Sequence, residues 1–179
     1  MDAIVGGAAR LDLVLLTPVL DDLVAGRRER ATAAIGAAIP DWWPDEHDAR
    51  FLRYRLTQAS RDPAAGEWLV RAIVLRGEGV VIGHAGFHGP PGVNALDEAG
   101  AVELGYTIFL PYRRRGYATE AVVELMRWAR EERGVRAFVA SVGPENEPSL
   151  AIVEKLGFSQ VGEHWDEEDG RELEFRLDT

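Results

Sequence analysis

Three consecutive arginines, Arg113, Arg114 and Arg115, precede a glycine in the segment Arg113-Arg114-Arg115-Gly116-Tyr117-Ala118-Thr119. This combination can bind an anion, because a glycine-containing turn at the start of a helix directs unpaired backbone N–H groups toward one point. The helix dipole and the guanidinium groups add positive charge there. A pyrophosphate has the size and charge for such a site. The alternative is a solvated run of charge on a loop.

A second motif lies about thirty residues further on, where Asn146-Glu147-Pro148-Ser149 is followed by Glu154-Lys155-Leu156-Gly157-Phe158. The spacing Arg113-x-x-Gly116-x-Ala118 resembles the acyl-CoA pyrophosphate loop of the GNAT N-acetyltransferases, and the second motif resembles a segment near the end of the same family. The resemblance covers about Leu11 to Leu177. Within the family the chain is most similar to the branch that acetylates protein N-termini, such as the ribosomal-protein alanine and serine acetyltransferases.

The resemblance implies acetyl-CoA as the co-substrate. In the family's fold, the fourth and fifth strands splay apart, and the pantetheine arm inserts between them and bonds main-chain atoms as an extra strand would. Asn146 is expected to bond the pantetheine, or else only to begin a helix before Pro148. Ile108, Phe109 and Leu110 are the main-chain candidates for the same arm. The pyrophosphate is expected at Arg113, Arg114, Arg115, Gly116, Tyr117, Ala118 and Thr119.

Acetylation requires a neutral nitrogen, whereas an α-amino group has a reference pKa of about 7.7–8.0 and a lysine about 10.4. Glu103 is the predicted general base, because it lies two residues before Gly105 at the start of the fourth strand, where related enzymes place a carboxylate. The alternative is a solvent-facing strand residue. Val153 replaces the tyrosine that many relatives use as the acid. Ser149 is therefore the candidate for protonating the CoA thiolate, or else a helix-start residue that bonds the backbone.

The elements that must position these residues predict a mixed α/β fold. Hydrophobic periodicity and turn residues indicate strands at 11–16, 68–75, 80–87, 102–110, 136–142, 158–165 and 173–177, with helices at 17–34, 48–60, 117–132 and 148–156. This order matches the acetyltransferase fold that the motifs imply, a mostly antiparallel central sheet flanked by helices. By resemblance, Trp42, Trp43 and Phe51 belong to one wall of the acceptor groove, although two adjacent tryptophans cannot both point inward.

Composition excludes several classes of protein. The net charge of −10 argues against a nucleic-acid binder, and no apolar run approaches the ~20 residues needed to cross a membrane. There is no cysteine, which excludes disulfides, thiolate metal sites and an acyl-cysteine intermediate. No metal is expected, because the four histidines show no metal-ligand spacing; His88 lines the acceptor site or merely ends a strand. The first residues lack the basic region of a secretory signal.

The sequence therefore predicts a single domain over residues 1–179, cytoplasmic, monomeric or homodimeric, with no nucleic-acid or membrane partner. Its predicted activity is direct acetyl transfer from acetyl-CoA to a primary amine. The acceptor stays open between a protein N-terminus and a small amine such as an aminoglycoside, a polyamine or an amino acid. An acyl-CoA sensor without activity is the alternative from another class, and Val153 is its main support.

Overall fold

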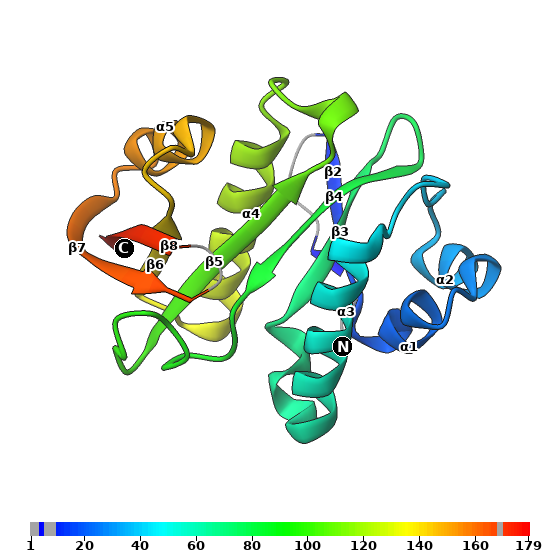
Figure 1. Cartoon of the computed structure of the whole chain (residues 1–179), viewed down its shortest axis with the longest axis horizontal. Coiled ribbons are helices and arrows are strands. Elements are labelled where there is room, and N and C mark those ends of the chain that lie inside the picture. The colour runs from blue at the N-terminus through cyan, green and yellow to red at the C-terminus, as the bar shows by residue number, and fades with distance from the viewer. Residues whose placement is uncertain (1–3, 6–9, 168–169) are drawn as a thin grey trace. The chain divides into compact units, whose positions relative to one another are not determined.

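The computed structural model describes residues 4–5, 10–167 and 170–179 (Figure 1). They form two compact units, each built from two separate stretches of chain. The first unit comprises the chain up to Gly86 together with Tyr106–Leu125, and the second comprises Phe87–Gly105 together with Met126–Thr179. The expectation of one domain over residues 1–179 stays a prediction.

The first unit contains a meander of antiparallel strands. β1 (Ile4–Val5), β2 (Leu11–Leu15), β3 (Val70–Leu75) and β4 (Val80–Phe87) neighbour one another in that order, and Phe87 alone of these residues falls in the second unit. All three pairings are antiparallel. The strands predicted from the sequence are confirmed. The two-residue strand β1 was not predicted, because so short a run shows no alternation.

The prediction of one continuous helix over residues 17–34 is wrong. The structure divides residues 17–35 into the 3₁₀ turn η1 (Thr17–Val19), the helix α1 (Leu20–Val24) and the helix α2 (Arg28–Ile35). The chain turns between the two helices at Gly26, whose φ of 69° lies in the left-handed region that glycine adopts easily. Thr17 does not cap a helix either, since its hydroxyl donates to the carbonyl of Gly66 at 2.7 Å.

The second predicted helix is confirmed as α3 (Glu46–Arg61). Asp45 caps it by accepting a hydrogen bond from the N–H of Asp48 at 2.9 Å. The short 3₁₀ turn η2 (Pro63–Glu67) follows and leads into β3.

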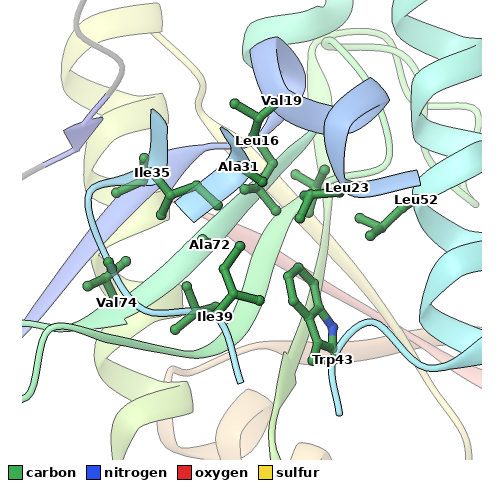
Figure 2. Close-up of a cluster of buried hydrophobic side chains, with 14 of the residues drawn as sticks. Leu16, Val19, Leu23, Ala31, Ile35, Ile39, Trp43, Leu52, Ala72 and Val74 are labelled. Atoms are coloured by element: carbon green, nitrogen blue, oxygen red, sulfur yellow. The ribbon is translucent and has the colours of Figure 1, made fainter. Parts of the chain in front are cut away.

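The core of the first unit lies between its helices and its sheet. Figure 2 shows side chains from η1, α1, α2 and α3 gathered in one cluster with Ala72 and Val74 of β3. Trp43 is completely buried in this cluster, which explains the loop before α3: the loop carries an indole into the core. The labelled members are Leu16, Val19, Leu23, Ala31, Ile35, Ile39, Trp43, Leu52, Ala72 and Val74.

The second unit begins with the first part of β5 (Ala101–Ile108) and includes the second half of the helix α4 (Tyr117–Arg133). It continues through β6 (Ala137–Val142), the helix α5 (Glu147–Lys155), and the hairpin of β7 (Ser159–Asp166) and β8 (Gly170–Asp178). The strand order in this unit is β5-β6-β8-β7. β6 is parallel to β5 and antiparallel to β8. These elements are the predicted ones, with ends that differ by at most three residues.

β5 and β6 separate after a short parallel stretch. Their pairing runs only from Ala101 opposite Ala137 to Glu103 opposite Val139. The 3₁₀ turn η3 (Leu110–Tyr112) follows β5 and precedes α4. The predicted fold class is confirmed: the protein is mixed α/β, with a mostly antiparallel sheet. The predicted fourth and fifth strands, which are β5 and β6, pair over three residues only.

The sheet of the second unit has one face packed on α4. Phe87 stacks on Trp128 of α4 with ring centroids 6.3 Å apart, and it lies 6.5 Å from Phe138 of β6. Side chains alternate between faces along a strand, so Glu103 and Ser141 project from the opposite face. That second face carries the hydrogen bond between the Ser141 hydroxyl and the Glu103 carboxylate.

Candidate functional site

The arginine segment forms an irregular turn that delivers the chain into α4. Arg114 adopts a φ of 61° and Gly116 a φ of 80°, and both values lie in the left-handed region. Such a φ is uncommon for a residue with a side chain, so the turn at Arg114 is held against its own preference. Arg113, Arg114 and Arg115 are all exposed. The first turn of α4, from Tyr117 onward, offers the backbone N–H groups that every helix leaves unpaired.

Arg10 holds this turn in place, and no motif in the sequence predicts this contact. Its guanidinium contacts the Glu120 carboxylate, with Nε and Nη2 each 2.7 Å from Oε2. The backbone N–H of Arg10 donates to Oε1 of Glu120 at 2.7 Å, and Nη1 donates to the Arg115 carbonyl at 3.1 Å. The same guanidinium lies 4.5 Å above the ring of Tyr117, which is a cation–π contact. Arg10 thus connects the loop to the first turn of α4.

The three residues expected to meet the pantetheine arm end β5 and begin η3. The carbonyl of Ile108 accepts from Nε of Arg113 at 2.8 Å, and the N–H of Phe109 donates to the carbonyl of Ile82 at 2.8 Å. The side chains of Ile108 and Phe109 are buried, whereas Leu110 is 76% exposed. These bonds fix the strand end in place.

Aromatic side chains gather at the wall predicted for the acceptor. Trp43 is buried while its neighbour Trp42 is 51% exposed, so the two adjacent indoles are not both buried, although both rings contact Phe109, with centroids 5.4 Å and 4.9 Å from its ring. Phe51 stacks on His84 with ring centroids 4.9 Å apart. Nε2 of His84 lies 3.6 Å from Oδ1 of Asp48. Burial raises the pKa of Asp48, but the neighbouring His84 outweighs it and the pKa lies below its ordinary value.

Glu103 is a buried carboxylate in the second unit. It is only 3% exposed, so the alternative of a solvent-facing strand residue is wrong. Oε1 accepts from the hydroxyl of Ser141 at 2.7 Å, and Oε2 accepts from the N–H of Ala95 at 2.7 Å. Burial raises the pKa of Glu103, but the contacts from His88, Ser141 and Ala95 outweigh it, and the pKa lies below its ordinary value.

His88 stands beside this carboxylate. Its Nδ1 lies 3.4 Å from Oε2 of Glu103, and its backbone N–H donates to the Glu103 carbonyl at 2.9 Å. Its Nε2 lies next to Gly105, only 3.3 Å from the place that a β-carbon would take there. From the sequence, His88 either lines the acceptor site or merely ends a strand. Its contact with Glu103 could not be predicted, because His88 follows β4 and Glu103 lies on β5, fifteen residues later.

Asn146 and Ser149 are placed at the start of α5. Asn146 is the N-cap, and its Oδ1 accepts from the backbone N–H of Ser149 at 3.3 Å. Asn146 therefore does order the helix entry. Both lie in the same unit as Glu103, and Asn146 also lines a shallow surface pocket with Pro148, Trp165 and Arg171.

The structure thus assigns the predicted site residues to two groups. Ile108 to Thr119 belong to the first unit, whereas Glu103, Asn146 and Ser149 belong to the second. Within the described residues, His, Asp and Glu form no group of three that could hold a metal ion. In the same part of the chain, no helix has both the length and the apolar character to span a bilayer.

Comparison with known proteins gives consistent matches. The chain matches the acetyltransferase (GNAT) domain over residues 10–159. The uncharacterized N-acetyltransferase YjdG of Bacillus subtilis (strain 168) is 27% identical over 164 residues, which are 87% of this chain and 93% of that protein.

Two solved structures share the fold. The ribosomal-protein-S5-alanine acetyltransferase from Vibrio fischeri superposes with a TM-score of 0.64 at 17% identity, over 99% of this chain and 97% of that one. The microcin C7 self-immunity acetyltransferase MccE, solved in complex with acetyl-CoA and AMP, superposes with a TM-score of 0.60 at 15% identity, over 98% and 94%.

Proposed function

This chain belongs to the acetyltransferase (GNAT) domain family and is an N-acetyltransferase, and we propose that it transfers the acetyl group of acetyl-CoA directly to the α-amine of a protein N-terminus. No enzyme thiol can carry the acetyl group, because the chain has no cysteine. Direct transfer requires both substrates in one complex, and the rate then comes chiefly from orienting amine and thioester.

The observation that carries the co-substrate assignment is the turn at residues 113–116. Three exposed arginines precede a helix start, and the turn that presents them is fixed by Arg10. Charge-assisted bonds from guanidinium groups and backbone N–H groups are the contacts that a pyrophosphate requires. MccE, which shares the fold, was solved with acetyl-CoA bound, and this supports the same co-substrate here. By resemblance, Ile108, Phe109, Leu110 and Asn146 then contact the pantetheine.

The acceptor assignment is supported by the fold shared with a ribosomal-protein alanine acetyltransferase and by the charge of the chain. A protein with a net charge of −10 attracts a cationic amine. Removal of the amine's proton depends on Glu103, the buried carboxylate of β5. Ser149 is the hydroxyl proposed to approach the departing thiolate.

The co-substrate assignment is tested by thermal unfolding with acetyl-CoA. A ligand of the native state stabilises it, by about 2.7 kcal/mol at one hundred times its Kd. Acetyl-CoA at millimolar concentration is expected to raise the Tm. Replacement of Arg113, Arg114 and Arg115 by alanine should weaken that shift in a salt-dependent manner. An unchanged shift in the triple variant would mean that the arginines are solvated and take no part in binding.

The acceptor is tested by following CoA release with a thiol-reactive dye, which the cysteine-free enzyme does not react with. A panel should pair peptides with the same peptides blocked at the N-terminus, and add lysine-containing peptides, polyamines, aminoglycosides and free amino acids. Turnover restricted to free N-termini supports the proposal. Turnover only with small amines assigns the enzyme to the other acceptor class.

A further inference from the structure

Glu103 is poorly placed to touch an amine itself. Its side chain is only 4% exposed, and both carboxylate oxygens already accept hydrogen bonds of 2.7 Å, one from Ser141 and one from Ala95. A group that takes a proton in the reaction must come within about 2.6–3.2 Å of it, directly or through a water. The low pKa of Glu103 also makes it a weak base near neutral pH.

His88 has the access that Glu103 lacks. Its side chain is 44% exposed, and its two ring nitrogens have different surroundings. Nδ1 lies 3.4 Å from Oε2 of Glu103, which favours the tautomer with the proton on Nδ1 because a carboxylate can only accept. The lone pair of the neutral ring is then on Nε2, on the side of Gly105.

The elements hold this pair in place. The backbone bond from His88 to Glu103 sets the chain after β4 beside β5. Glu103 is paired with Val139 of β6, and Ser141 lies two residues further along β6 on the same face. Glu103 and Gly105 also share that face of β5. The imidazole therefore rests on a carboxylate that two strands and a loop position.

From this geometry we propose that Nε2 of His88 is the atom that takes the proton from the acceptor amine, and that Glu103 is a positioning residue that orients the ring and stabilises its charged form. This inference rests on the proposed function. The neutral amine nitrogen attacks the thioester carbonyl carbon, the N–C bond forms, and the C–S bond breaks with its electron pair going to sulfur. Nε2 takes the proton that nitrogen loses and the imidazolium gives it to solvent, while the thiolate takes a proton from the hydroxyl of Ser149, which recovers one from solvent.

Gly105 has a definite part in this arrangement. A β-carbon at this position would lie 3.3 Å from Nε2 of His88, which is tighter than ordinary van der Waals contact. The missing side chain leaves the edge of the imidazole accessible from β5. Gly105→Ala is therefore expected to lower kcat/KM severalfold with little effect on the Tm.

The first test compares His88→Gln, Glu103→Gln and the double variant, with His47→Gln as the matched control on the exposed start of α3. Each single change is expected to lower kcat/KM about 10²- to 10⁴-fold. The double variant should lose no more than the worse single one, because the two residues act as a unit. His47→Gln should match the wild type.

The second test is the pH profile of kcat/KM with a peptide acceptor. The carboxylate of Glu103 faces His88, and Glu98, in the loop after β4, is paired with Arg176 of β8. Both the amine and His88 must lose a proton, so log(kcat/KM) should rise with pH at a limiting slope of about two in the wild type and about one in His88→Gln. Imidazole in the buffer should restore part of the activity of His88→Ala and should leave the activity of His47→Ala unchanged.

Three results would overturn the assignment of His88. One is His88→Gln activity within about twofold of the wild type. The others are a wild-type slope that His88→Gln leaves unchanged, and fully multiplicative losses in the double variant. If the wild type itself releases no CoA with any amine, the proposed function fails instead. The Tm of each variant, measured in parallel, separates loss of chemistry from loss of fold.

Discussion

Arg10 and Glu120 are 110 residues apart in the sequence, yet the carboxylate of Glu120 receives both the guanidinium and the backbone N–H of Arg10. The pair joins the residue before β2 to the first turn of α4. Glu120 also lies where a negative charge favours the helix dipole. The start of α4 is thus held by a contact that does not use the side chains of Arg113, Arg114 and Arg115.

Arg10→Gln is expected to weaken acetyl-CoA binding roughly three- to tenfold. The arginines of the loop remain, but the Arg115 carbonyl loses its donor and the turn loses its fixed geometry. The exposed ion pair itself is worth about 0–1 kcal/mol, so the Tm should fall by only a few degrees. Calorimetric titration measures the affinity. Arg53→Gln, on the exposed side of α3, should change neither quantity; equal effects of the two substitutions would contradict the bracing role.

Gly116→Val should lower both stability and acetyl-CoA affinity, because φ is 80° and valine is strained there. The new side chain would also meet Nη2 of Arg10, which lies 3.5 Å from the position of the added β-carbon. Gly134→Val is the matched control, since φ is 71° and open space surrounds that position. It should cost similar stability and leave affinity unchanged. Matching losses of affinity would show that strain alone explains the effect.

The stability of the protein at acid pH should depend on Glu103. Its folded-state pKa lies below the unfolded value, so it contributes stability above the unfolded pKa, about 4.3, and loses that contribution as pH falls through the folded pKa. Below about pH 4.5 the difference in free energy of unfolding between wild type and Glu103→Gln should therefore shrink. Urea unfolding at several pH values from about 3 to 7 measures this difference in the free energy of unfolding. Glu78→Gln, in the exposed turn after β3, should follow the wild type throughout.

Two substitutions should separate the role of Asn146 as a helix cap from its proposed role as a contact to the pantetheine. Asn146→Ala removes the acceptor for the N–H of Ser149 and should cost about 1 kcal/mol of stability. Asn146→Asp retains a capping oxygen and should keep the Tm. If Asn146 also binds pantetheine with its amide N–H, both variants lose acetyl-CoA affinity. Full affinity in Asn146→Asp would leave the residue with the cap alone.

The predictable part of this protein is what periodicity and local turn chemistry encode. The apolar spacing from Ala118 to Ala129 predicts α4, and Gly77-Glu78-Gly79 predicts the hairpin of β3 and β4. The break between α1 and α2 was missed because a glycine inside an amphipathic pattern is compatible with a continuous helix, whereas Gly26 here adopts a φ of 69° and the chain turns at this residue.

The site shows the same limit. Motif spacing located the arginine turn and Glu103 on their elements, but their partners come from distant parts of the chain. Arg10 precedes Arg115 of the turn by 105 residues. The neighbours of Glu103 are Ser141, from another strand, and His88, from a loop. Nothing local in a sequence marks an imidazole as the neighbour of a buried carboxylate. Only the register of β5 with β6 and the course of the chain after β4 bring them together.

The division of the chain into two units has a genetic consequence. The boundaries fall between Gly86 and Phe87, between Gly105 and Tyr106, and between Leu125 and Met126, which lie within β4, β5 and α4. No linker separates the units, so neither can be expressed as one continuous fragment or exchanged by joining gene segments end to end. The residues that hold the turn at 113–116 and those that surround Glu103 must therefore be inherited together, and selection on either acts on a single reading frame.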